Sequence, residues 1–253
     1  MRQYILFSMY VKLKKKYGQN FLIDDNITNK IINLINHNNL NILEIGPGDG
    51  KLTNKLINKK PKKLDLIEID TELVKNLIDK FKNHNFLNVI NNDILKYDII
   101  NNYDLVISNL PYNISSQVLI KLSLMREVPN EMILMFQKEF ATKLLEDKLN
   151  SINSIINCFF KIRLKFHVSK NCYRPIPKVD SSVLKFEKLN KSLIKTDEIE
   201  SFIKFKRYLF SYKRKSLGNL LKKYKFNENI NLSMRAESLK LKELIKIFRE
   251  INS

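Results

Sequence analysis

The sequence Glu44-Ile45-Gly46-Pro47-Gly48-Asp49-Gly50 joins a short apolar run to an amphipathic segment, and it indicates the fold more clearly than any other part of the chain. The run Asn41–Ile45 has the length of a buried strand, whereas Leu52–Ile57 spaces its apolar residues as a helix does. Glycines reach positive φ angles at little cost, so they allow a sharp turn that passes close to a bound nucleoside. We therefore expect an open α/β sheet with a ligand site at this turn.

Short apolar runs alternate with amphipathic segments over residues 40–137. The predicted strands are Asn41–Ile45, Leu64–Ile69, Leu87–Asn91, Leu105–Ser108 and Met132–Phe136. The predicted crossover helices are Leu52–Ile57, Leu73–Phe81 and Val118–Leu124. Two more strands, Ile162–Val168 and Val183–Phe186, lie on either side of an ordered, proline-containing loop at Tyr173–Asp180. This order predicts an α/β fold with a seven-stranded, doubly wound, Rossmann-like sheet.

The strand pattern ends after Asn190, and the remaining residues have helical periodicity. Three segments there, Ile199–Leu209, Leu217–Tyr224 and Leu239–Ile251, also carry many Lys and Arg residues. We therefore divide the chain into an α/β domain of residues 1–190 and a small all-helical domain of residues 191–253.

The chain is strongly basic, with 45 Lys and Arg against 26 Asp and Glu, a formal net charge of +19. An excess of this size is typical of proteins with a polyanionic partner, and nucleic acid is the favoured one. An A/T-rich genome would also enrich Lys, Asn and Ile, but that bias alone does not explain so few acidic residues. We expect a nucleic-acid partner.

Cysteine and histidine are scarce, and no metal site is predicted. Cys158 and Cys172 are far from any C-x-x-C spacing, and only three histidines are present. Two reduced thiols fit a reducing cytoplasm. The apolar run Tyr4–Val11 is too short to span a bilayer and is followed, not preceded, by its lysines. We expect a soluble monomer without a membrane partner. A bacterial cytoplasm is favoured over an organelle as its compartment.

Acidic residues follow the predicted second and third strands. Glu68 ends one strand, where an acid in a dinucleotide fold binds both ribose hydroxyls, and Asp93 follows the next, where it can accept from an adenine amine. Either alone could be a solvated loop carboxylate. Together with Glu44 they form a series that predicts a nucleoside pocket. No G-x-x-x-x-G-K-[ST] motif is present, so a cofactor without phosphates, S-adenosylmethionine, is favoured over a triphosphate.

Asn109-Leu110-Pro111-Tyr112 follows the fourth predicted strand, at the edge where open α/β sheets bind ligands. An exocyclic amine of a base is a poor nucleophile because its lone pair is delocalised into the ring. If the Asn109 side-chain oxygen and the Leu110 carbonyl each accept one amine hydrogen, the nitrogen becomes tetrahedral and its lone pair points at the methyl donor. Pro111 would make the turn rigid, and Tyr112 would stack on an extruded base. The motif predicts methyl transfer to a base amine.

Six motifs together resemble the ribosomal RNA adenine dimethyltransferase family. They are Tyr17–Leu22, Asn109–Ser115, Gln137–Glu139, Pro177–Val183, Ser216–Leu220 and Arg235–Leu239. The resemblance runs from about Lys14 to Leu241. It implies a class I methyltransferase domain followed by a helical RNA-binding domain. The implied reaction dimethylates two adjacent adenines in a hairpin near the 3′ end of small-subunit (16S) ribosomal RNA, as free RNA or in a 30S assembly intermediate, during ribosome biogenesis.

The resemblance also implies residue roles. Those implied to contact S-adenosylmethionine are Asn20, Leu22, Gly46, Glu68, Asp93 and Asn109. The target adenine would lie between Tyr112 and Tyr173, where the family usually has Phe at the second position, so Tyr173 adds a hydroxyl that needs a partner. A second departure is the shortened loop at Leu145–Ser151, which puts the RNA contacts of that loop in doubt.

Basic clusters occur near both ends of the chain. Lys12 and Lys14–Lys16 precede the first motif, and Lys213, Arg214 and Lys215 lie in the helical segment. Either cluster could be a solvated charged surface. Because an RNA hairpin has to be held by its phosphates, we predict that Lys213, Arg214 and Lys215 bind RNA.

Three other functions fit parts of this pattern. A resistance methyltransferase for large-subunit ribosomal RNA is disfavoured by Gly18, Asn113 and Arg235–Glu237. A non-enzymatic nucleic-acid-binding factor would not need to keep the nucleoside pocket or Asn109. A DNA adenine methyltransferase would need a target-recognition domain, which the sequence does not contain.

Overall fold

The computed structural model describes residues 18–212, 214–224 and 231–252. Its contacts divide the chain into two compact units. The first comprises Met1–Ala141 and Arg163–Glu187, and the second comprises Thr142–Ile162 and Lys188–Ser253. This division differs from the predicted domains because residues 142–162 group with the C-terminal helices. The second change of unit, after Glu187, lies three residues before the predicted boundary at 190.

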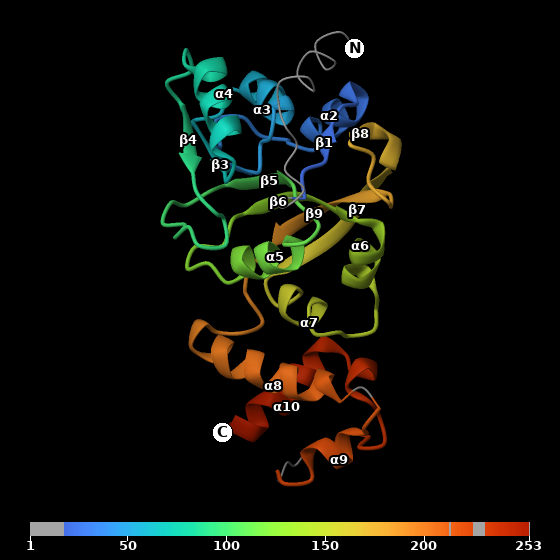
Figure 1. Ribbon diagram of the computed structural model, residues 1–253. Helices are drawn as coiled ribbons and strands as arrows, with labels where there is room; N and C mark the ends of the chain where they lie inside the picture. The colour runs from blue at the N-terminus through green and yellow to red at the C-terminus, as the bar shows by residue number, and fades with distance from the viewer. Residues whose placement is uncertain (1–17, 213, 225–230, 253) are drawn as a thin grey trace. The chain divides into compact units, whose positions relative to one another are not determined.

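A seven-stranded sheet forms the centre of the first unit, in the order β4-β3-β2-β5-β6-β9-β7 (Figure 1). The strands are β2 (Asn41–Ile45), β3 (Lys63–Glu68), β4 (Leu87–Asn91), β5 (Leu105–Asn109), β6 (Glu131–Gln137), β7 (Phe160–Val168) and β9 (Ser181–Lys188). The first five are parallel, and β9 runs antiparallel to β6. All seven were predicted, and the α/β fold class is confirmed.

Helices cover both faces of this sheet. Figure 1 shows α2 (Asp25–Ile32), α3 (Lys51–Leu56) and α4 (Thr71–Phe81) on one face and α5 (Ser115–Ser123) on the other. Leu77 and Phe81 of α4 belong to one buried cluster with Leu64 and Leu66 of β3. Because both faces are covered, the central strands are almost continuously apolar and do not alternate with polar residues.

Helix α2 and a pair of short strands in the first unit were not predicted. Helix α2 begins after Asp24, whose side chain accepts a hydrogen bond from the Ile27 amide, a typical N-cap. Strand β1 (Phe21–Leu22) pairs antiparallel with β8 (Tyr173–Arg174). The loop predicted at Tyr173–Asp180 therefore begins with strand β8. Through this pairing, β8 holds the segment that precedes α2.

Where the structure describes it, the second unit is helical apart from the strand ends that enter it. Its elements are the end of α6 (Lys138–Leu145), α7 (Asn153–Ile156), α8 (Ile199–Ser211), α9 (Leu217–Leu221) and α10 (Leu241–Asn252), with 3-10 turns at Thr196–Glu198 and Ala236–Ser238. Phe202 of α8 and Phe248 of α10 pack edge to face, with ring centroids 5.2 Å apart. The helical C-terminal segment is as predicted, although α9 ends at Leu221, before the predicted Tyr224.

Candidate functional site

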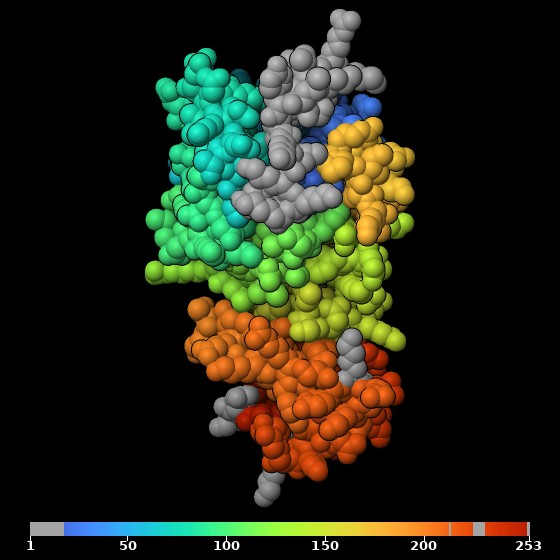
Figure 2. Space-filling view, in the orientation of Figure 1, coloured from blue at the N-terminus to red at the C-terminus, as the bar shows by residue number. Residues whose placement is uncertain are grey.

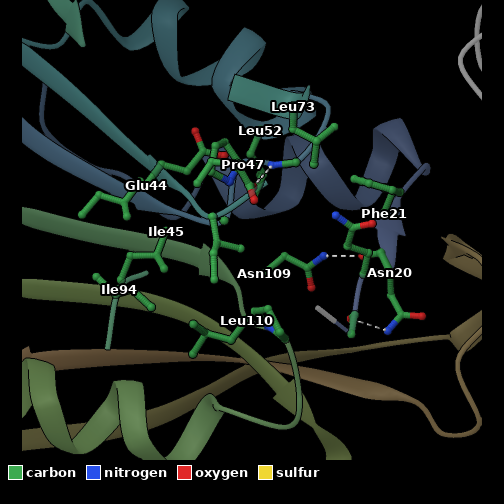
Figure 3. Close-up of a pocket in the computed structure, with 18 of the residues that line it drawn as sticks. Asn20, Phe21, Glu44, Ile45, Pro47, Leu52, Leu73, Ile94, Asn109 and Leu110 are labelled. Atoms are coloured by element: carbon green, nitrogen blue, oxygen red, sulfur yellow. Dashed lines mark hydrogen bonds between the residues drawn. The ribbon is translucent and has the colours of Figure 1, made fainter. Parts of the chain in front are cut away.

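A cavity opens at the carboxyl ends of β2, β3, β4 and β5 (Figure 3). The chain order reverses here, because β3 lies on one side of β2 and β5 lies on the other. This is the switch point where open α/β sheets bind ligands. The predicted cofactor and catalytic residues that line the cavity are Asn20, Leu22, Gly46, Glu68, Asp93, Asn109, Leu110, Pro111 and Tyr112. The structure thus brings all of these residues together at one edge of the sheet.

The glycine turn has the positive φ angles expected from the sequence. Gly46, Gly48 and Gly50 have φ angles of 63°, 61° and 77°. A Cβ atom on Gly48 would lie 2.8 Å from the Phe21 ring, and one on Gly50 would lie 2.8 Å from the Phe81 ring. A Cβ atom on Gly46 would meet nothing within 4 Å. Since Gly46 lines the cavity, that open space belongs to the ligand site.

Glu68 is buried at the end of β3, with 6% of its surface exposed. One carboxylate oxygen accepts from the Gly48 amide at 3.2 Å, and the other accepts from the Asp70 amide at 2.9 Å. Burial raises the pKa of this carboxyl, and the amides of Asp70 and Gly48 oppose that rise. Each oxygen keeps a second lone pair, so Glu68 can still accept hydrogen bonds from hydroxyl groups.

Glu44 lies deeper beneath the turn. Its Oε2 atom accepts a hydrogen bond from Thr53 Oγ1 at 2.7 Å. Burial raises the pKa of Glu44 to about 8, and the nearby carboxylates of Asp49 and Glu68 act in the same direction. The Glu44 carboxyl is therefore protonated in the fold over much of the range in which exposed glutamates are ionised.

Asp93 stands in the loop after β4. Its Oδ1 atom accepts from the Leu95 amide at 2.9 Å, which shapes the loop from within. Lys121 of α5 holds the same loop from outside, because its Nζ atom donates to the carbonyls of Leu95 at 3.1 Å and Tyr97 at 2.7 Å. The sequence contained no signal for this role of Lys121, since it depends on the packing of α5 beside the loop.

Asn109 is oriented by a segment far away in the sequence. Its Nδ2 atom donates to the Asn20 carbonyl at 2.9 Å, and the Asn20 side chain donates to the Gly18 carbonyl at 3.2 Å (Figure 3). The amide group of Asn109 therefore has a fixed direction, with its nitrogen toward Asn20. Its oxygen is the end that can accept a hydrogen from a ligand.

The segment of residues 18–24 is fastened by contacts that sequence reasoning missed. Lys51, only 9% exposed, donates to the Ile23 carbonyl at 2.6 Å and forms an ion pair with Asp25 at 3.1 Å. Gln19 donates to Asp70 at 3.1 Å. The residues that form the two hydrogen bonds are 28 and 51 positions apart in the sequence, so no local sequence pattern predicts these contacts.

The two predicted stacking residues differ in exposure. Tyr112 lines the cavity, and its hydroxyl shares a hydrogen bond of 2.7 Å with Ser181 Oγ. Burial raises its pKa. Tyr173 is completely buried and is not among the residues that line the cavity. Its hydroxyl donates to the Met135 sulfur at 2.8 Å, which is the partner that the replacement of Phe by Tyr required.

The predicted RNA-binding residues belong to the second unit. Arg214 and Lys215 are exposed, and Lys215 Nζ lies 4.7 Å from the centroid of the Tyr212 ring. Lys213 lies outside the described residues, as do Lys12 and Lys14–Lys16. Across the residues with assigned positions, no group of three or more His, Cys, Asp and Glu side chains could hold a metal ion. None of the helices in those same ranges is long and apolar enough to cross a membrane.

Comparisons with known proteins show which family this chain is similar to. A family model described as "Ribosomal RNA adenine dimethylase" matches residues 10–253. A relative from Mycoplasmopsis pulmonis, named ribosomal RNA small subunit methyltransferase A, is 38% identical over 95% of this chain and 100% of its own. One of the same name from Mycoplasma capricolum is 38% identical, covering 95% of this chain and 98% of its own.

Solved structures include two of similar fold. A dimethyladenosine transferase from Plasmodium falciparum matches with a TM-score of 0.81 and 25% identity, covering 92% of this chain and 97% of its own. The 23S rRNA methyltransferase ErmE matches with a TM-score of 0.74, covering 92% of this chain and 100% of its own. At 21% identity, the second likeness concerns the fold alone.

Proposed function

The chain belongs to the ribosomal RNA adenine dimethylase family, and we propose that it dimethylates two adjacent adenines near the 3′ end of small-subunit ribosomal RNA. It is an enzyme, a methyltransferase of ribosomal RNA. The choice of small-subunit RNA is supported by relatives of that name, which are 38% identical over nearly the whole chain. The observation that carries the mechanism is the convergence of Asn109–Tyr112 and the buried acids on one cavity.

The cavity fits S-adenosylmethionine as cofactor. The space beside Gly46 admits a ligand close to the backbone, and Glu68 presents a carboxylate at the strand end where a ribose would bind. Asp93 stands on the next loop, where it would accept from the adenine amine. Asn20, Leu22 and Asn109 would complete the contacts. When bound, the cofactor supplies a methyl group on a positively charged sulfur.

The residues of the chain prepare the amine for attack. With its amide nitrogen bonded to the Asn20 carbonyl, Asn109 presents its oxygen as an acceptor. That oxygen and the Leu110 carbonyl would each accept one amine hydrogen, which localises the lone pair on nitrogen. Pro111 limits the freedom of the loop, and Tyr112 offers a ring face to the base. Each methylation forms one bond from the nitrogen to carbon and releases one proton from the nitrogen. After the first methylation one hydrogen remains, so only one of the two acceptors would hold it in the second.

Tyr173 would take part only after a local rearrangement. It is buried, and β8 pairs with β1, so its ring reaches a base only if this pairing loosens. Phosphate contacts are proposed for Lys213, Arg214 and Lys215 of the helical segment. We propose that the protein acts as a monomer in the cytoplasm, on RNA or on a 30S assembly intermediate.

The proposal is tested by transfer of radiolabelled methyl groups from S-adenosylmethionine to small ribosomal subunits that lack dimethyladenosine. We expect label in dimethyladenosine at the 3′-terminal hairpin, identified by nucleoside analysis. Label on large-subunit RNA would instead favour the resistance-enzyme function. No label on either RNA, with nucleic acid still bound, would favour a binding factor.

The role of Asn109 is tested by Asn109→Ala. We expect methyl transfer to be abolished, because the amine loses its acceptor, while S-adenosylmethionine affinity stays within a few-fold. Calorimetric titration with the cofactor and single-turnover transfer measure the two effects separately. An equal loss of both would mean that Asn109 is mainly a cofactor ligand.

A further inference from the structure

Residues 201–226 of the second unit contain Lys and Arg but no acidic residue. The basic residues of this stretch are Lys204, Lys206, Arg207, Lys213, Arg214, Lys215, Lys222, Lys223 and Lys225. In Figure 2 the described residues of this stretch, drawn in orange, form a broad part of the visible surface of the second unit. Such a concentration of positive charge attracts a polyanion without specifying which part of it is recognised.

Two tyrosines lie on this basic surface. Tyr208 and Tyr212 are 39% and 44% exposed, and they are the aromatic members of the set of exposed large apolar side chains that the structure describes. Tyr208 lies in the last turn of α8, and Tyr212 is the C-cap residue that follows the helix. Their ring centroids are 5.6 Å apart at an interplanar angle of 70°. Leu209 and Phe210, between them, are buried and anchor this turn in the core.

Neighbouring groups restrict both rings. The Tyr208 hydroxyl donates to the Leu220 carbonyl at 3.0 Å, which ties α8 to α9. The backbone amide of Lys215 donates to the Tyr212 carbonyl at 2.9 Å, and its Nζ atom lies 4.7 Å from the Tyr212 ring centroid. The cation is attracted by the electron-rich face of the ring, and the ring itself is 44% exposed. Tyr208 thus has a structural task, whereas Tyr212 presents an ordered aromatic surface among cations.

We propose that Tyr212 is a stacking platform for an unpaired base of ribosomal RNA, with Lys215 and Arg214 binding the adjacent phosphates. The inference rests on the proposed function, since it presumes an RNA substrate, and it adds a contact that recognises bases in the helical unit. On binding, the Lys215 ammonium would move from the ring to a phosphate, and the base would take its place. Unpaired bases expose a ring face, whereas bases in an A-form duplex do not.

The absence of tryptophan from the chain makes the proposal directly measurable. Tyr212→Trp keeps an aromatic face and introduces a single fluorescent reporter. The probes are a short single-stranded RNA and a ribose-phosphate oligomer of equal length without bases. We expect the RNA to quench the tryptophan emission and to bind roughly ten-fold more tightly than the abasic oligomer, in the range of one base–aromatic stack.

Two outcomes would overturn the platform. Equal affinity and equal quenching by both oligomers would mean that the surface recognises phosphate charge alone. Binding of RNA without any quenching would mean that Tyr212 lies outside the contact. The reporter control is Ile78→Trp, because Ile78 is 53% exposed on α4 in the first unit. RNA-dependent quenching of the same size in this control would also reject the proposal.

A variant without an aromatic ring tests whether the stacking platform contributes to substrate binding. For Tyr212→Leu we expect a KM for small subunits raised about ten-fold, with S-adenosylmethionine affinity unchanged in calorimetric titration. An unchanged KM would count against the platform while leaving the proposed reaction intact. If the unsubstituted protein transfers no methyl group to small subunits, the proposed function fails instead, and the quenching experiment still decides whether Tyr212 binds bases.

Discussion

At the scale of single residues, the glycine turn separates a position that serves the ligand from one that serves the fold. Gly46 and Gly50 have similar positive φ angles, so an alanine at either suffers a comparable backbone strain of roughly 1–2 kcal/mol. Their surroundings differ, because a Cβ atom meets open cavity at Gly46 but the Phe81 ring at Gly50. The two positions therefore form a matched pair.

We expect Gly46→Ala to weaken S-adenosylmethionine binding more than it weakens the fold. Its methyl group would occupy space that the ligand needs, so affinity should fall by ten-fold or more. Gly50→Ala should instead lower the free energy of unfolding by more than the backbone strain alone, since Phe81 has to shift. Calorimetric titration and urea denaturation of both variants measure the two quantities. Full cofactor affinity in Gly46→Ala would contradict the assignment of this space.

The pKa of Glu44 predicts a dependence of stability on pH. It is raised from 4.5 to about 8 by burial, so the folded chain holds this proton more tightly than the unfolded chain. The contribution is complete below pH 4.5 and is lost as the pH rises toward 8. Asp49, Glu68 and Lys80 lie in the same electrostatic environment, so they share in the titration.

Glu44→Gln keeps a neutral acceptor for Thr53 and removes the titrating proton. We expect the free energy of unfolding of the unsubstituted protein to fall between pH 5 and pH 8, by at most about 1.4 kcal/mol per pH unit from this group. The variant should show a smaller fall, measured by urea denaturation at each pH. Parallel curves for the two proteins would mean that Glu44 does not change its protonation on folding.

At the scale of elements, helices and short strands hold the loops of the site. The pairing of β1 with β8 connects the residues that cover the cavity to Tyr173 on the proposed substrate side. Lys121 connects α5 to the loop that carries Asp93. The residues of β1 line the cavity themselves, whereas Lys121 lies outside it and acts on the loop that carries Asp93.

Lys121→Met keeps the aliphatic packing of the side chain but removes both hydrogen bonds to the loop. We expect the KM for S-adenosylmethionine to rise several-fold, with little change in kcat, because Asp93 loses position but the acceptors of the amine do not. Lys121→Arg should restore part of the affinity, since it can still donate to the carbonyls. A fall in kcat without a change in KM would show that the loop does not act through the cofactor.

At the scale of the whole molecule, the binding of the two proposed ligands differs in how strongly it depends on charge. The net charge of +19 favours binding of the RNA polyanion. The cofactor cavity, in contrast, is lined mainly by buried acids and apolar side chains. Phosphate contacts release counterions from RNA, so their affinity depends steeply on salt. A small cofactor in a cavity should show little of this dependence.

We expect affinity for small-subunit RNA to fall by a factor on the order of 10³ between 50 and 200 mM salt if about six phosphates are bound. Replacing Lys213, Arg214 and Lys215 together with Ala should lower the slope of log affinity against log salt by roughly two to three. Filter binding at several salt concentrations measures the slope, and calorimetric titration of S-adenosylmethionine provides the control. An unchanged slope in the triple variant would place the phosphate contacts elsewhere.

The sequence alone was sufficient for the sheet, its glycine turn and the residues at its carboxyl edge. Strands, helices and turns have local signatures in periodicity and glycine placement. Parallel strands also bring their carboxyl ends to one edge, so Gly46, Glu68, Asp93 and Asn109 were expected to meet. The structure places all four on one cavity.

Only the tertiary structure decided the direction of the Asn109 amide, the support of the Asp93 loop by Lys121 and the burial of Tyr173 against Met135. It also decided that residues 142–162 pack with the C-terminal helices. Asn109 and Asn20 are 89 residues apart, and Tyr173 and Met135 are 38 residues apart. Contacts of this kind depend on how complete elements pack together, and no periodic pattern within one segment encodes them.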